Sequence, residues 1–454
     1  MSRWTGALFD PRRFAPSRTS SDDTPDQSME RGCQIGSDRP SAFNPWLHRF
    51  AIFTAISTLG LIIIGGLVTS HGAGMAVPDW PNTYGYNMFA FPISKWVGGV
   101  LYEHSHRLMA TFVGLLTAIL TLWLWVRETR GKGRWLGVGT IVMVLGLMGV
   151  RALPVYLILA CLALTVGGFG LYQIRRNFAA LRWWGALAFA TVILQGVLGG
   201  LRVVWLKDQI GIFHAALAQL FFALTCLIAL FTSRWGHERA TLLVRAAIPV
   251  AKAIRAESRA PVQSVFAWLL PAATLLIFAQ LILGATMRHQ HAGLAIPDFP
   301  LAYGKVWPPM DSASVTHYNQ QRHEIIAVNP ITALQIGLQM AHRIMALLIC
   351  GAVAFCAWST RRQVGASHPL SKLTLVWFGV IVTQALLGAA TIWSDKAADV
   401  ATAHVMVGAL SLALGAIVSI VASRTLVWAR AVPAAEAQAL SPFGLQPSPH
   451  TGIK

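Results

Sequence analysis

Long apolar runs separated by short polar segments make up most of the chain after residue 45. Each run holds roughly 16 to 28 residues with almost no charge, about the length that a helix needs to cross a hydrocarbon layer of about 30 Å. The third run is short, and only a weak polar break at 151–154 separates it from the fourth. The pattern predicts an all-α membrane protein with about ten spans, at 47–70, 98–126, 135–150, 153–174, 183–206, 210–231, 264–287, 334–358, 372–393 and 399–423.

The composition excludes an ordinary soluble protein and changes the meaning of the charge. Hydrophobic residues make up 55% of the 454 residues and charged residues 12%, while the formal net charge is +18. Lys and Arg gather in alternate connecting segments, as they do in the cytoplasmic loops of membrane proteins. This distribution predicts that both termini are cytoplasmic and that the charge reflects topology, with no nucleic acid as partner. The basic clusters are at 127–134, 175–182, 234–259 and 361–372.

An internal repeat divides the apolar part of the chain into two halves. Both copies enter the membrane from the same side, which predicts two pseudo-symmetric four-helix bundles related by an axis along the membrane normal. The helical hairpin predicted at 135–174 has no counterpart in the second half and is interpreted as an insertion. The matched segments are 73–81 with 292–300, 106–110 with 342–346, and 195–199 with 384–388.

The spans and the repeat predict five consecutive segments. Residues 1–45 are rich in Ser, Asp, Pro and Arg and lack the apolar core of a signal peptide, so we expect a disordered cytoplasmic tail. The other four are a first bundle at 46–231 that includes the hairpin, a cytoplasmic linker at 232–262, a second bundle at 263–425 and a cytoplasmic tail at 426–454.

Four histidines occupy matched positions in the predicted spans of the two halves. An ionisable side chain is costly in lipid and usually marks a function. Imidazole is the commonest metal-binding side chain, and two imidazoles from facing helices of a bundle can hold a haem between them. The predicted pairs of axial ligands are His106 with His214 and His342 with His404. Both pairs are expected near the outer face, where the loops 71–97 and 288–333 would cover them.

The residue one turn before the first ligand differs between the halves. Glu103 precedes His106, whereas Gln339 holds the matching place before His342. A carboxylate beside a haem can move protons, and an amide cannot. The difference predicts a reactive site in the first half, with Glu103 as the catalytic residue, and an electron-transfer or structural site in the second. A carboxylate that merely rests at the membrane interface is the alternative.

Further polar residues lie next to the predicted ligands. His104 is about 200° around the helix from His106 and matches Met340, so the repeat favours His106 as the ligand. Arg107 and Arg343 directly follow the ligands and are candidates for binding haem propionates, with snorkelling to the interface as the alternative. Histidines at 71, 289, 291, 317 and 323 have no matched partners and are assigned no role.

These motifs together resemble the haem A synthase family, the membrane enzymes that oxidise haem O to haem A. The resemblance covers about residues 46–126 and 180–425 and implies a haem b cofactor in the second bundle and haem O as substrate in the first. It also implies oxidation of the C8 methyl of haem O to a formyl group, with electrons passing through the second haem. The residues that carry it are Glu103-His-Ser-His106-Arg107, His214, Gln339-Met-Ala-His342-Arg343, His404 and the two Pro-Asp-aromatic-Pro loops.

The resemblance further implies partners and a location. Haem O synthase would supply the substrate, a haem-copper terminal oxidase would receive the product, and an electron donor that the sequence does not name would act at the cell (inner) membrane. A homo-oligomer is compatible with the sequence. Two other functions stay open: a di-haem membrane cytochrome b without substrate oxidation, and a haem transporter or chaperone. The hairpin at 135–174 lies outside the eight helices usual in the family and would serve packing or partner binding.

Overall fold

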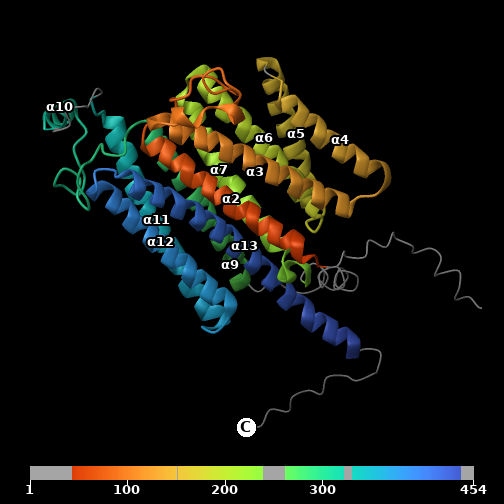
Figure 1. The fold of residues 1–454 in the computed structure, drawn as a ribbon. Coiled ribbons are helices and arrows are strands. Elements are labelled where there is room, and N and C mark those ends of the chain that lie inside the picture. Colours follow the sequence, from red (N-terminus) through yellow and green to blue (C-terminus); the bar gives the residue numbers. More distant parts are fainter. Residues whose placement is uncertain (1–42, 151, 239–260, 322–329, 441–454) are drawn as a thin grey trace, which may run out of the picture. The chain divides into compact units, whose positions relative to one another are not determined.

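The computed structural model describes residues 43–150, 152–238, 261–321 and 330–440, and helices account for most of them (Figure 1). The predictions for residues 1–42, for most of the 232–262 linker and for 441–454 lie outside this described part. Within it the longer helices are α2 (Pro45–Ser70), α3 (Gly98–Glu128), α4 (Gly131–Met148), α5 (Leu153–Arg176), α6 (Leu181–Trp205), α7 (Asp208–Thr232), α9 (Pro261–His289), α10 (Ser312–Gln320), α11 (Ala333–Val364), α12 (Pro369–Trp393) and α13 (Ala398–Leu440). Two short 3₁₀ turns, η1 (Met88–Ala90) and η2 (Ile93–Lys95), lie in the loop before α3.

The described helices confirm an all-α membrane protein. Nine of them are long and apolar enough to cross a membrane, one fewer than the ten predicted. The exception is α4, whose 18 residues carry Lys132 and Arg134 near the start, so no apolar stretch of membrane length is left. Placing both termini on one side requires α4 to cross as well, and that topology therefore stays a prediction.

Local sequence signals explain where several of these helices begin. Asn44 caps α2 by accepting hydrogen bonds from the backbone N–H groups of Trp46 and Leu47, and Pro45 occupies the first turn. Thr332 and Gln335 form a capping box at the start of α11. In a membrane these caps matter because an unpaired backbone group there cannot form a hydrogen bond with water.

The helices of each half contact one another in a closed ring. In the first half α2 contacts α3, α3 contacts α6, α6 contacts α7 and α7 contacts α2. The second half has the same cycle of α9, α11, α12 and α13. The halves meet where α2 and α7 contact α13 and where α7 contacts α9, while α4 and α5 pack outside the first ring against α3 and α6 (Figure 1). Two four-helix bundles and a peripheral hairpin are therefore present; their pseudo-symmetry axis stays a prediction.

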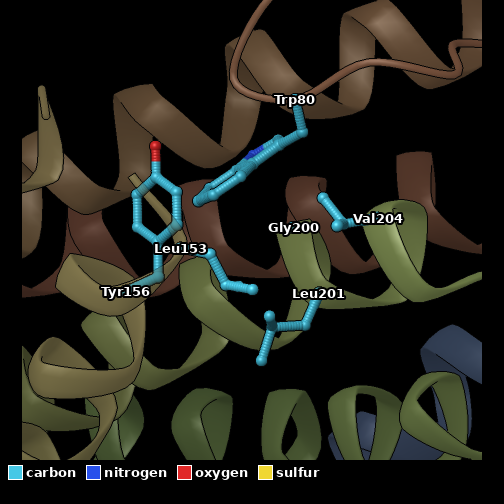
Figure 2. Close-up of a pocket in the computed structure, with 6 residues that line it drawn as sticks. All are labelled: Trp80, Leu153, Tyr156, Gly200, Leu201 and Val204. Atoms are coloured by element: carbon cyan, nitrogen blue, oxygen red, sulfur yellow. The ribbon is translucent and has the colours of Figure 1, made fainter. Parts of the chain in front are cut away.

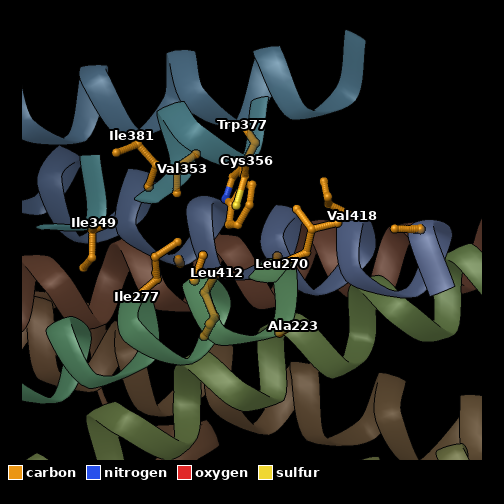
Figure 3. Packing of buried hydrophobic residues seen from close by; sticks show 14 of the residues in the cluster. Ala223, Leu270, Ile277, Ile349, Val353, Cys356, Trp377, Ile381, Leu412 and Val418 are labelled. Atoms are coloured by element: carbon orange, nitrogen blue, oxygen red, sulfur yellow. The ribbon is translucent and has the colours of Figure 1, made fainter. Parts of the chain in front are cut away.

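The core of the second bundle is organised around Trp377 of α12. This side chain is fully buried and donates a hydrogen bond from Nε1 to the Ser411 carbonyl oxygen of α13, at 2.9 Å. Figure 3 shows it surrounded by apolar side chains that include Cys356 and Val418. Because the only polar atom of the indole is paired, the large ring can fill the bundle without an unsatisfied donor. Cys356 is packed here as a small hydrophobic residue.

Candidate functional site

The two predicted histidine pairs are formed in the structure. His106 of α3 faces His214 of α7 with ring centroids 6.4 Å apart and planes inclined by 79°. His342 of α11 faces His404 of α13 with ring centroids 6.5 Å apart and planes inclined by 63°. Each pair thus joins two helices of one ring, and the two pairs have nearly the same separation.

Each of the four imidazoles lies against a glycine of the neighbouring helix. A methyl group built on Gly65 of α2 would lie 3.0 Å from Cε1 of His106, and one on Gly199 of α6 would lie 3.4 Å from that of His214. In the second half the corresponding glycines are Gly284 against His342, at 3.3 Å, and Gly388 against His404, at 3.1 Å. Because these residues are glycines, each ring can lie close to the backbone of the adjacent helix. The ring positions in the two halves are therefore restricted in the same way.

Glutamine side chains hold the backbone at the same positions. Gln195 Nε2 donates to the His214 carbonyl oxygen at 3.0 Å, and Gln280 Nε2 donates to that of His342 at 2.9 Å. Gln384 differs, because its backbone carbonyl oxygen lies 3.1 Å from Nδ1 of His404. Nδ1–H of His404 can donate to this oxygen, and Nε2 of the same ring lies 3.4 Å from the side-chain Nε2 of Gln384. Gln280 was missed from the sequence because it has no matched partner; its only signal is a lone amide in an apolar run.

The geometry of the pairs fits a haem better than a bare metal ion. Two imidazole nitrogens that bind one metal at about 2 Å each place the ring centroids about 6 Å apart, close to the separations found. In the described part of the chain no group of three or more His, Cys, Asp or Glu side chains is placed to hold a metal ion. A site with two protein ligands suits a metal whose remaining ligands come from a macrocycle, as in haem.

Unpaired nitrogen atoms argue against a purely structural role for these histidines. Nδ1 of His106, His214 and His342 is buried and has no hydrogen-bond partner. A histidine kept only for packing normally has its buried nitrogen atoms paired, because an unpaired polar atom costs free energy. The protein's own hydrogen bonds therefore do not account for the burial of these three rings.

Glu103 and Arg107 bind the loop that precedes α3. Glu103 is 4% exposed, and its carboxylate accepts the Val77 backbone N–H at 2.8 Å and an Arg107 Nη2 bond at 2.8 Å. Arg107 also donates to the carbonyl oxygens of Val77, Asp79 and Asn82. Glu103 and Arg107 therefore anchor the loop to α3 one turn before His106. Their hydrogen bonds go to the loop and to each other, not to the rings of the first histidine pair.

Gln339 and Arg343 make the corresponding contacts in the second half. The Gln339 amide oxygen accepts the Ile296 backbone N–H at 2.7 Å, and its Nε2 donates to the Ile296 carbonyl oxygen at 3.2 Å. Arg343 donates to the carbonyl oxygens of Asp298 and Leu301. Both arginines therefore donate hydrogen bonds to carbonyl oxygens of the loops, and their predicted propionate role stays a prediction.

The two loops have the same internal construction. Asp79 accepts the backbone N–H groups of Tyr84 and Gly85, and Asp298 accepts those of Tyr303 and Gly304. Gly85 and Gly304 both have positive φ, and both aromatic-Pro peptide bonds, at 80–81 and 299–300, are cis. These contacts make each loop an ordered cover anchored to the helix that carries the first histidine of its pair.

His104 and the loop histidines have other surroundings. His104 is fully buried, its Nδ1 lies 3.1 Å from Thr83 Oγ1, and its ring packs against Phe91 and Trp96. These contacts place it among the residues that anchor the loop. His71 stacks on Tyr102 at 4.1 Å, and the His289 ring lies against Gly211, less than one turn before His214. His323 lies outside the described residues.

Fold and site together define a multi-pass all-α membrane protein with two bis-histidine sites suited to haem. The chain belongs to the COX15-CtaA family of cytochrome oxidase assembly proteins, which matches residues 48–416. It is similar to the haem A synthase of Lysinibacillus sphaericus, 21% identical over 363 residues that cover 80% of this chain and 90% of the relative. The haem A synthases of Halalkalibacterium halodurans and Rhizorhabdus wittichii are each 23% identical, over 80% and 83% of this chain and 93% of either relative. Membership of this family implies that haem is involved.

Proposed function

We propose that this protein is a haem A synthase, which oxidises the C8 methyl group of haem O to a formyl group. Two bis-histidine pairs, whose ring centroids lie 6.4 and 6.5 Å apart, carry the proposal. They occur in a chain that matches the family over most of its length. The relatives named haem A synthase support the same reaction.

In this proposal the two sites have different occupants. His342 and His404 hold haem b as the resident cofactor, and His106 and His214 hold haem O as the substrate. The bound haem b supplies one-electron chemistry to the first site. The glycines and glutamines described above fix the ligand rings, and the two anchored loops exclude water from the sites.

Glu103 is proposed as the catalytic carboxylate of the first site. Its place one turn before His106 and its replacement by Gln339 in the second half support this role. Its hydrogen bonds to Val77 and Arg107 hold it in a fixed orientation at the base of the loop. A carboxylate held in this way could accept or return a proton during oxidation of the substrate.

The partners and the location are proposed with the function. Haem O synthase would supply the substrate, a haem-copper terminal oxidase would use the product, and an electron donor would act from the outer side of the cell (inner) membrane. The basic clusters at 127–134, 175–182 and 361–372 support cytoplasmic placement of those segments. The histidine pairs would then lie toward the outer face.

Analysis of the extracted haem tests the reaction. The full chain is expressed with a supply of haem O and a working electron donor, and the haems are extracted and identified by mass. We expect hydroxylated and formyl haem to accumulate. Finding only haem B and unmodified haem O under these conditions would overturn the proposal.

A di-haem membrane cytochrome b is the second candidate. It is favoured by the loop contacts, because Glu103 and Gln339 accept the same kind of backbone N–H bond and the carboxylate need have no further task. In that case both haems would be permanent cofactors. The same extraction distinguishes the two, since a cytochrome b would return each haem unchanged.

A further inference from the structure

A small apolar cavity lies beside the first histidine pair. It has a volume of about 200 Å³ and is lined by Trp80, Leu153, Tyr156, Gly200, Leu201 and Val204. Figure 2 shows Trp80 reaching in from the loop before α3, with Tyr156 of α5 on one side and Gly200 and Val204 of α6 on the other. The cavity therefore joins three parts of the first half: the anchored loop, the inserted hairpin and a helix of the ring.

The cavity and the His214 site use neighbouring residues of α6. The Trp80 indole lies so close to α6 that a methyl group on Gly200 would be 2.5 Å from it. The preceding residue, Gly199, is the glycine that contacts the His214 ring. One turn of α6 therefore contacts the His214 ring through Gly199 and lines the cavity through Gly200.

The second half has a larger side chain at the matching place. With Gln195 aligned to Gln384, Val204 corresponds to Trp393, and Trp80 corresponds to Phe299 through the repeated loop. The Trp393 ring lies 5.9 Å from the Phe299 ring, and its Nε1 donates to the Phe299 carbonyl oxygen at 3.3 Å. In the second half an indole therefore packs beside the loop aromatic residue, at the place where the first half has a valine side chain.

The size of the cavity selects the kind of occupant. Pockets that enclose a whole small molecule measure about 300 to 1,000 Å³, so a cavity of this size takes one substituent and not a macrocycle. Its walls are mainly apolar. A flexible hydrocarbon chain attached to a haem at His214 matches these properties, since burial of each CH₂ group contributes about 0.8 kcal/mol.

We propose that this cavity binds the isoprenoid chain of the haem substrate and that Val204 and Trp393 determine which haem each site accepts. The inference rests on the proposed function, because haem O differs from haem b by a farnesyl-derived chain on one pyrrole ring. The first site accepts the chain beside Val204. The second site excludes it with Trp393 and takes the haem that lacks it. The inserted hairpin supplies Leu153 and Tyr156 to the chain-binding wall.

A graded series at residue 204 tests the proposal. Val204→Ala, Val204→Leu and Val204→Trp are purified as full chains from cells supplied with haem O, and the bound haems are identified by mass. Haem O per chain should fall with increasing side-chain volume, by about tenfold in Val204→Trp, while haem b per chain stays constant. Retained haem b shows that each variant has folded. Leu164→Trp is the matched control, because it adds an indole to an exposed part of α5 that does not line the cavity.

The outcomes separate this inference from the proposed function. Equal haem O content across the series would overturn the role of the cavity, whatever the unmodified chain does to haem O, and would leave a membrane lipid as its occupant. A fall equal to that in Leu164→Trp would also overturn it. Failure of the unmodified chain to produce formyl haem would overturn the proposed function, whereas a selective loss of haem O in Val204→Trp would still support the cavity as a chain-binding site.

Discussion

Both carboxylate oxygens of Glu103 are engaged, one by the Val77 N–H and the other by Arg107. Gln339 reproduces the first of these contacts with Ile296, so an amide is sufficient to hold such a loop. What an amide cannot supply is a negative charge and a site for a proton. The repeat therefore provides, within one chain, a natural comparison of the structural and the chemical roles of this position.

Substitution of Glu103 by Gln should separate these two roles. We expect the variant to bind haem at both sites, because the amide oxygen can still accept the Val77 N–H. Formation of formyl haem should fall by about 10²- to 10⁴-fold, the usual contribution of a positioned acid or base. The rate is measured as product per bound haem O.

Gln339→Glu is the matched control for this substitution. It introduces a carboxylate at the corresponding place in the second half, four residues before Arg343, and should leave the rate nearly unchanged. If Glu103→Gln forms product at the full rate, Glu103 acts only as an anchor for the loop.

At the scale of the elements, glycines set the distance between neighbouring helices at all four ligands. Gly65, Gly199, Gly284 and Gly388 each lie on the helix adjacent to the one that carries the ring. An added methyl group would push the ring or separate the helices, and overpacking of this kind typically costs 1–3 kcal/mol. The ligand geometry is thus a property of helix pairs as much as of the histidines.

Gly65→Ala should weaken haem binding at the first site. The added methyl group would lie 3.0 Å from Cε1 of His106, closer than an ordinary contact. We expect haem O at this site to bind about tenfold more weakly, measured as the amount retained per chain during titration. Gly114→Ala on α3 is the control, because a methyl group there meets nothing within 4 Å. Equal retention in both variants would contradict the argument.

At the scale of the whole molecule, two helix rings with nearly identical ligand pairs serve different tasks in the proposed function. The rings meet through α2, α7, α9 and α13, and the His289 ring of α9 lies against α7 close to His214. An element of the second half therefore reaches the first site. This contact is consistent with a division of labour in which one half supplies electrons and the other holds the substrate.

Removal of one ligand from each ring tests which half holds the resident cofactor. His342→Ala should abolish the low-spin b-type absorption spectrum of the purified chain, because one axial ligand is lost. His106→Ala should have a smaller effect on this spectrum and should lose haem O instead. The reverse pattern would mean that the two halves have been assigned the wrong way round.

The residues explain how much of this arrangement could be predicted. The helices and the pairing of His106 with His214 and His342 with His404 followed from apolar runs and from the repeat, which are local patterns. The tenth span stays a prediction, because α4 forms where it was expected but is short and charged at its start. The anchoring role of Arg107 and the contribution of Gln280 were missed, because each depends on a partner far away along the chain.

The sequence by itself determined that this is a helical membrane protein with duplicated histidine positions, because lipid restricts spanning segments to apolar helices and makes each intramembrane histidine conspicuous. Only the tertiary structure decided what surrounds those histidines. The glycine against each ring, the loops fastened to α3 and α11, and the cavity between Trp80 and Val204 all arise where separate elements pack together. Periodicity records which face of a helix is apolar, but the space left between two helices depends on side chains from both.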